Sequence, residues 1–161
     1  MSCGRPGDVA TCDERRQRAT SPQEERRYLL APADSPDVAV VLAHLDRALD
    51  GDVRTQDAPI LVATLMRNRK AGPQVWRAVT QRWDELVERF AERAHVLMVT
   101  AVATFASDPA LAAEVRRFHE AHTEAAYERR VAQVLDLMDV NVAVAQRSAG
   151  TLATTLREFA R

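Results

Sequence analysis

Apolar residues recur along the chain three and four residues apart, and this spacing predicts helices. The clearest run has successive intervals of 3, 4, 3 and 4 residues and consists of Trp76, Val79, Trp83, Leu86 and Phe90. Long β-branched alternation is absent, and the helix formers Ala, Leu, Arg and Glu dominate. The pattern therefore predicts an all-α protein in which one long helix over residues 72–90 buries both tryptophans.

Proline, glycine and small polar residues predict where the other helices begin. Ser21-Pro22 has the N-cap and first-turn residues of a helix start, and Ser35-Pro36-Asp37 opens a helix that ends before Gly51. The other expected starts are Thr55, Arg93, Ser107-Asp108-Pro109, Thr123 for a helix to Gln146, and Ser148 for a last helix weakened by Gly150. Together these starts predict about eight helices.

Three of these prolines are nearly evenly spaced. Pro73 follows Pro36 by 37 residues, and Pro109 follows Pro73 by 36 residues. Such a period is typical of helical solenoids, in which each helix pair buries its apolar face against its neighbours. We therefore expect a right-handed superhelix of antiparallel helix hairpins, HEAT- or armadillo-like, over residues 21–161; a closed helix bundle is the alternative. Residues 1–20 are predicted to be a flexible arm, with Asp13–Arg18 as a candidate helical stretch.

Composition excludes some functions. The 161 residues carry 22 Lys and Arg against 23 Asp and Glu, a net charge of −1, which argues against nucleic acid or a membrane surface as the main partner. No apolar run is long enough to span a membrane, and the first 20 residues lack the apolar core of a secretory signal, so we expect a cytoplasmic protein. Cys3 and Cys12 are too few for a disulfide framework or a zinc site and are interpreted as incidental thiols.

The histidines do not form a known catalytic motif. His119 and His122 are three residues apart, whereas the zincin motif His-Glu-x-x-His places its ligands four apart. We interpret them as a surface pair, with a metal site as the alternative, and His44 and His95 as boundary or helix-start residues. The sequence also lacks a nucleophile elbow, a Walker loop and a dinucleotide-binding glycine motif. We therefore expect no catalytic, cofactor-binding or metal-binding residue.

Charged pairs and doublets fit solvated helix faces. Glu85 and Arg89 are spaced for a surface ion pair. The basic doublets either face solvent or line a concave surface where they meet a carboxylate. These doublets are Arg26-Arg27, Arg116-Arg117 and Arg129-Arg130.

Several motifs together, in their order and spacing, make residues 20–161 resemble the C-terminal helical domain of the M1 zinc aminopeptidases, which is named after the endoplasmic-reticulum aminopeptidases. The segments Thr20–Leu29, Gly51–Pro59 and Trp83–Leu86 carry much of the resemblance, as does the stretch from Phe105 to Phe118. The family-motif residues, which the resemblance implies are structural, are Arg27, Tyr28, Arg54, Gln56, Asp57, Pro59, Asn68, Gly72, Trp76, Trp83, Phe105, Phe118 and Arg130.

In that family the domain is a superhelix of helix hairpins that caps the catalytic domain and helps admit peptides. The resemblance implies that the zinc and the catalytic residues belong to a separate catalytic domain, so that this chain binds no cofactor and has no peptidase activity of its own. It implies a fragment or truncated form of a larger peptidase, with an aminopeptidase catalytic domain or a peptide as partner. The alternative is a stand-alone helical-repeat scaffold that binds a peptide or protein.

Two features depart from the family. Pro32 falls where the family generally continues a helix, so we expect that helix to end at Leu30. The family also has further helices before Ser21. Their absence would leave the first hairpin uncapped, which predicts an exposed apolar face and self-association through it.

Overall fold

The computed structural model describes residues 4–5, 7–90, 92–105, 108–123 and 125–159. Within these ranges all regular structure is helical, with nine α-helices, one 3-10 helix and no strand, so the prediction of an all-α protein is confirmed. The elements are α1 (Asp8–Gln17), α2 (Pro22–Leu30), η1 (Ala31–Asp34), α3 (Val38–Asp50), α4 (Ala58–Met66), α5 (Gly72–Gln81), α6 (Trp83–Arg89), α7 (Glu92–Phe105), α8 (Pro109–His122) and α9 (Glu128–Phe159).

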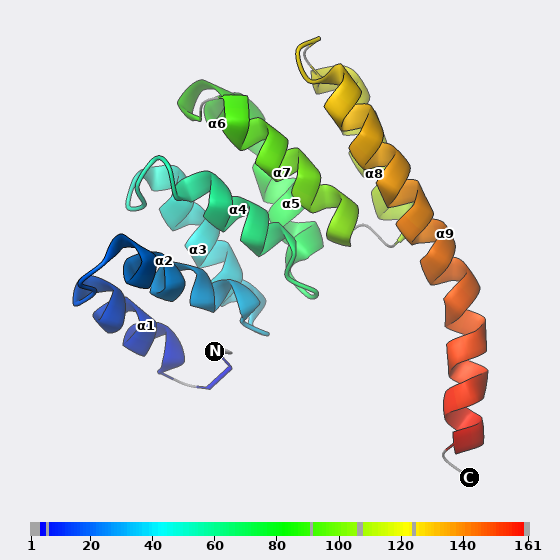
Figure 1. Ribbon diagram of the computed structural model, residues 1–161, viewed down its shortest axis with the longest axis horizontal. Coiled ribbons are helices and arrows are strands. Elements are labelled where there is room, and N and C mark those ends of the chain that lie inside the picture. The colour runs from blue at the N-terminus through cyan, green and yellow to red at the C-terminus, as the bar shows by residue number, and fades with distance from the viewer. Residues whose placement is uncertain (1–3, 6, 91, 106–107, 124, 160–161) are drawn as a thin grey trace. The chain divides into compact units, whose positions relative to one another are not determined.

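The chain divides into two compact units, Met1–Ala101 and Val102–Arg161. In the first unit, α1 packs on α2, α3 on α4 and α4 on α5, and contacts also join α2 to α4 and α3 to α5 (Figure 1). Contacts limited to near neighbours in the chain are typical of helical repeats. In the second unit, α8 and α9 pack side by side. The superhelical course of the whole array stays a prediction.

Three predicted helix starts are confirmed by side-chain caps. Ser21 Oγ accepts a hydrogen bond from the Glu24 amide at 3.2 Å at the start of α2. Asp37 Oδ1 and Asp108 Oδ1 accept from amides two residues later, at 2.9 and 2.7 Å, at the starts of α3 and α8. Helix α2 ends at Leu30 as expected, because Pro32 is accommodated in η1 rather than in an α-helix.

The end of α3 is confirmed, whereas the predicted start of α4 is wrong. Gly51 follows α3 with a φ of 96°, a left-handed conformation that favours glycine. Helix α4 begins at Ala58 after Asp57, so Thr55 lies in the preceding turn and does not cap the helix. A hydrogen bond from the Asp57 amide to the Arg54 carbonyl, at 2.8 Å, closes that turn.

The N-terminal segment, predicted as a flexible arm with a candidate helical stretch at Asp13–Arg18, contains helix α1. Helix α1 occupies Asp8–Gln17 and packs on α2, and Cys12 is only 2% exposed. Arg15 also lies over the ring of Tyr28, so polar side chains as well as Cys12 contribute to this contact. Because α1 covers α2, the premise of an uncapped first hairpin does not hold. Cys3 lies outside the described residues.

The long helix expected over residues 72–90 is interrupted at Arg82, whose φ of −112° and ψ of 23° separate α5 from α6. The Arg82 guanidinium contacts Asp50 of α3 at 3.4 Å and Glu85 of α6 at 2.8 Å. Trp76, Val79, Leu86 and Phe90 are buried, as predicted, but Trp83 is half-buried. The interruption therefore removes one tryptophan from the expected apolar face.

Two helices expected at the C-terminal end are one. Helix α9 runs for 32 residues from Glu128 to Phe159, so neither Thr123 nor Ser148 starts a helix. Gly150 lies within α9; glycine weakens a helix by about 1 kcal/mol relative to alanine but does not end it. Among the described helices, none combines the length and apolar character needed to cross a lipid bilayer.

Candidate functional site

A charged cleft of about 270 Å³ opens in the first unit beside α1, α2 and the segment before α4. Its lining has equal numbers of basic and acidic side chains. They are Arg16, Arg26, Arg54, Glu25, Asp52 and Asp57. The motif residues Arg54 and Asp57, which the sequence analysis singled out, therefore lie together, and Arg26 joins them from the first basic doublet.

The charges in this cleft form specific pairs. Arg26 of α2 reaches the buried carboxylate of Asp57 through Nε at 2.7 Å and Nη2 at 2.6 Å. Arg54 Nη2 lies 2.5 Å from Glu25 Oε2, again joining α2 to the segment before α4. The sequence pattern predicts either a solvated or a carboxylate-binding face for Arg26. Its partner is a carboxylate of the same chain, 31 residues away.

Arg47 of α3 forms a further set of charge pairs, which the sequence pattern does not predict. It donates to Asp13 Oδ1 of α1 at 2.9 Å and to Asp52 Oδ2 at 2.8 Å. Burial disfavours its charge, but the hydrogen bonds to Asp13 and Asp52 outweigh this and raise the pKa of Arg47. The hydrogen bond from Arg47 holds the pKa of Asp52 below its usual value, so Asp52 stays ionised at neutral pH and offers no proton for catalysis. These bonds join α1 and α3 to the turn after α3, whereas the Arg26 and Arg54 pairs separately join α2 to the segment before α4.

Asn68 forms a second junction, beyond the end of α4. Its Nδ2 donates to the carbonyls of Ala33 and Ser35, each at 2.8 Å. Its Oδ1 accepts from the amides of Lys70 and Ala71, each at 2.9 Å. Asn68 is only 7% exposed, and these four bonds use the full capacity of its amide. This one side chain therefore ties η1 to the turn that leads into α5.

The other motif residues do not gather in one place. Pro59, Gly72 and Trp76 are buried, whereas Tyr28, Trp83 and Phe118 are half-buried. The exposed motif residues are Arg27, Gln56 and Arg130. The side chain of Phe105 lies outside the described residues. A structural role for the set as a whole stays a prediction.

The interpretation of His119 and His122 as a surface pair is wrong for His119, which is 2% exposed. His122 is exposed, and its ring stacks on Phe118 with centroids 4.2 Å apart. The His122 Nδ1 atom lies 2.8 Å from the Phe118 carbonyl, so it carries the proton and is not a metal ligand in this arrangement. No cluster of three or more metal-ligating side chains occurs among the residues that the structure describes.

The remaining histidines are His44 and His95. His44, expected at the boundary of its helix, is buried with 3% exposure, and burial first and then the charge of Arg47 lower its pKa. The side chain of His95 lies outside the described residues.

Burial of His119 makes the stability of the folded chain depend on pH, because protonation of its ring favours the unfolded chain. Desolvation, with a smaller contribution from the charge of His122, lowers the pKa of His119 to about 4 from its usual value of 6.5. Between these pH values the unfolded chain binds more protons than the folded chain, so stability falls as the pH falls. The loss approaches about 1.4 kcal/mol per pH unit at most.

Chemical denaturation at pH 7.5 and at pH 5 measures this effect. We expect the wild-type chain to lose more stability over this interval than a His119→Gln variant, which lacks the titrating group. His44 contributes with the same sign in both proteins, so their difference isolates His119. Equal losses in the two proteins would contradict the lowered pKa of His119.

The second unit has its own hollow, of about 500 Å³, beside the end of α8 and the start of α9. Ala125, Val131, Ala132 and Leu135 give it apolar walls, and Glu120 and Glu128 lie at its edge. Such a combination accommodates an apolar side chain next to a positive charge.

Within the residues that the structure describes, the chain is an all-α domain with charge pairs at its helix junctions. The model of the ERAP1-like C-terminal domain matches residues 4–139, which is most of the chain. The chain belongs to this family, a C-terminal domain of peptidases, and the resemblance seen in the sequence is confirmed. No curated protein matches the chain at a significant level.

Proposed function

We propose that this chain is the non-catalytic C-terminal domain of an M1 zinc aminopeptidase and that it closes or shapes the cavity in which the peptide substrate binds. The family match over residues 4–139 carries the proposal. The pairing of the cleft charges supports it, because guanidinium and carboxylate groups held by each other position helices rather than exchange protons. Its partner is the aminopeptidase catalytic domain, which supplies the zinc, and the proposed location is the cytoplasm.

The test is reconstitution with a purified M1 catalytic domain. The chain alone is expected to show no chelator-sensitive hydrolysis of aminoacyl anilides and no stoichiometric zinc. Added to the catalytic domain, it is expected to co-purify with it and to change kcat/KM for peptides more than for aminoacyl anilides, because only peptides extend into a closed cavity. Turnover by the chain alone, or no binding to the catalytic domain, would overturn the proposal.

A scaffold that binds a peptide is the second candidate, and the hollow beside α8 and α9 favours it. Acidic residues beside apolar walls suit a peptide with a basic and an apolar side chain. Fluorescence anisotropy with such peptides tests it on the chain alone. Binding that is lost in a Glu128→Lys variant, without any interaction with a catalytic domain, would favour the scaffold.

A further inference from the structure

Helix α1 buries much less apolar surface than the other helices of its unit. Cys12 is its only buried residue, whereas seven of the nine residues of α4 are buried. Next to Cys12, the Arg15 guanidinium lies 5.9 Å from the centroid of the Tyr28 ring of α2. A helix of ten residues is too short to be stable in water by itself. Helix α1 (Figure 1) therefore depends on its contacts with the neighbouring elements.

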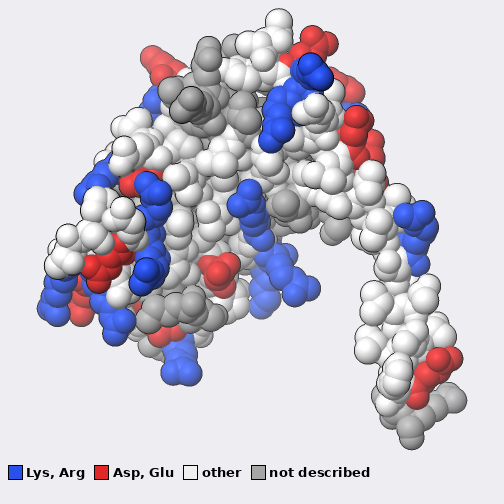
Figure 2. Space-filling view, viewed as in Figure 1, with Lys and Arg blue, Asp and Glu red and all other residues white. Residues whose placement is uncertain are grey.

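Two ion pairs supply the remaining contacts that hold α1. Asp13 accepts a hydrogen bond from Arg47 of α3 at 2.9 Å, and Arg16 lies 3.6 Å from Asp52 in the turn after α3. All four side chains keep between 15 and 52% of their surface exposed. Figure 2 shows both basic and acidic side chains at the surface of α1 and α2. Ion pairs that water reaches contribute little to stability and are weakened by salt, so they hold α1 only loosely.

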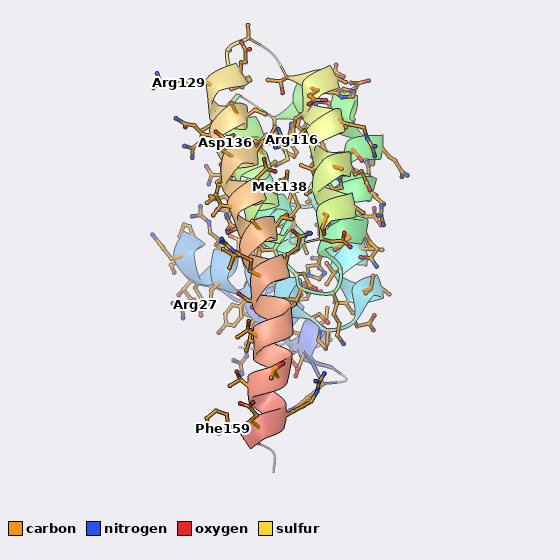
Figure 3. All side chains as sticks on the ribbon, turned by 90° about the vertical axis from the view of Figure 1, so that its right-hand side faces the viewer. Arg27, Arg116, Arg129, Asp136, Met138 and Phe159 are labelled. Carbon is orange, nitrogen blue, oxygen red and sulfur yellow. The ribbon has the colours of Figure 1, made fainter. Side chains whose placement is uncertain are left out.

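Helix α2 is fixed by contacts in which α1 takes no part. Ser21 Oγ caps α2 by accepting from the Glu24 amide at 3.2 Å. Arg26 joins α2 to Asp57, and the neighbouring Arg27 is exposed (Figure 3). Release of α1 therefore breaks neither the N-terminal cap of α2 nor the charge pair that joins α2 to the segment before α4.

The C-terminal end of α1 also forms one side of the charged cleft. Arg16 and Gln17 of α1 line this cleft, together with Ala19 in the connection to α2. Leu29 and Val53 line it as well, and they are only 5 and 4% exposed. Movement of α1 away from α2 removes one side of the cleft. The position of α1 therefore determines how open the cleft is.

We propose that α1 is a strap that opens and closes the charged cleft while the rest of its unit stays folded, and that higher ionic strength favours the open form. Segments with few buried apolar contacts open at a smaller cost in free energy than the whole domain. Helix α1 is such a segment, because one buried side chain and two ion pairs open to water attach it to the unit. This inference does not depend on the proposed function.

Alkylation of Cys12 by iodoacetamide tests the proposal, because this buried thiol reacts only when α1 opens or the whole unit unfolds. The rate is measured by mass spectrometry on the whole chain with Cys3→Ser, at urea concentrations below the unfolding transition. Global unfolding allows a rate equal to that of the unfolded thiol multiplied by the unfolded fraction from circular dichroism. We expect Cys12 to react at least about a hundredfold faster than this, with less than about a third of the urea dependence.

Ala63→Cys, in a background with Cys3→Ser and Cys12→Ala, is the matched control. Ala63 of α4 is 2% exposed, as is Cys12, but it belongs to a helix that is mostly buried. Its thiol is expected to react only through global unfolding, with the full urea dependence. Ala48→Cys, at a buried position of α3, replaces this control if Ala63→Cys lowers the helix content. Equal urea dependence for Cys12 and the core thiol would overturn the proposal.

Neutralising Asp13 tests the contribution of charge. Asp13→Asn, which weakens the contact with Arg47, is expected to speed alkylation of Cys12 about three- to fivefold at about 20 mM NaCl. Raising NaCl to about 500 mM is expected to speed the reaction of the parent chain by a similar factor and that of the variant by less. Glu14→Gln neutralises the next residue, which is exposed and forms no ion pair within the described part of the chain, and should leave the rate nearly unchanged. Equal effects of the two substitutions, or a rate that salt does not alter, would contradict the proposal.

Discussion

Trp76→Ala is expected to lower the free energy of unfolding by about 3–5 kcal/mol, the usual cost of removing a large aromatic side chain from a core. Trp76 lies in α5 and is 1% exposed, among the largest fully buried side chains of the described residues. Removing it loses apolar burial and leaves a cavity that rigid helix neighbours fill only in part. Urea denaturation followed by circular dichroism measures the change.

Trp83→Ala is the matched control, because it removes the same side chain seven residues away. Trp83 is half-buried at the start of α6, so the expected loss is smaller, about 1–2 kcal/mol. The sequence pattern alone predicts the same burial for the two tryptophans, whereas in the structure Trp76 is buried and Trp83 only half-buried. Equal losses for the two variants would contradict the interruption at Arg82 and support one continuous helix.

This difference shows how far periodicity predicts the fold. Spacing and caps gave the helix starts at Ser21, Asp37 and Asp108, because those signals are local and each residue acts on its own first turn. The break at Arg82 has no such local signal, since neither glycine nor proline marks it, and Arg82 contacts Asp50 of another helix as well as the nearby Glu85. The continuity of α9 through Gly150 shows the converse, because a residue that weakens a helix locally does not necessarily end it.

The candidate site was predictable only in part for the same reason. The resemblance placed Arg54, Asp57 and Asn68 in the motif set, but single-sequence patterns do not say which groups they contact. Arg26, which binds Asp57, and the two carbonyls that accept from Asn68 lie more than 30 residues away in the chain. Burial of Cys12 was likewise hidden, because it lies among polar residues in the sequence. His119, in contrast, follows the buried Leu111 and Val115 at intervals of four residues, so helical spacing could have predicted its burial.

Asn68→Asp is expected to destabilise the chain by about 3–5 kcal/mol at pH 7, because it directs a buried carboxylate at two carbonyl oxygens. In the wild type Nδ2 donates to the carbonyls of Ala33 and Ser35, and an ionised carboxylate donates to neither. The acceptor side of the network, toward the amides of Lys70 and Ala71, is retained. The variant therefore isolates the two donated hydrogen bonds.

The pH dependence of this loss separates charge from shape. Burial and the facing carbonyls raise the pKa of the introduced carboxyl in the folded chain, so the folded state binds the proton more tightly than the unfolded state. The deficit relative to wild type should therefore shrink between pH 7 and pH 4, as the carboxyl takes up a proton and donates to one carbonyl. Gln56→Glu makes the same amide-to-acid change at an exposed residue and should cost less than about 0.5 kcal/mol. A deficit for Asn68→Asp that stays constant with pH would show that shape, not charge, determines the cost at this junction.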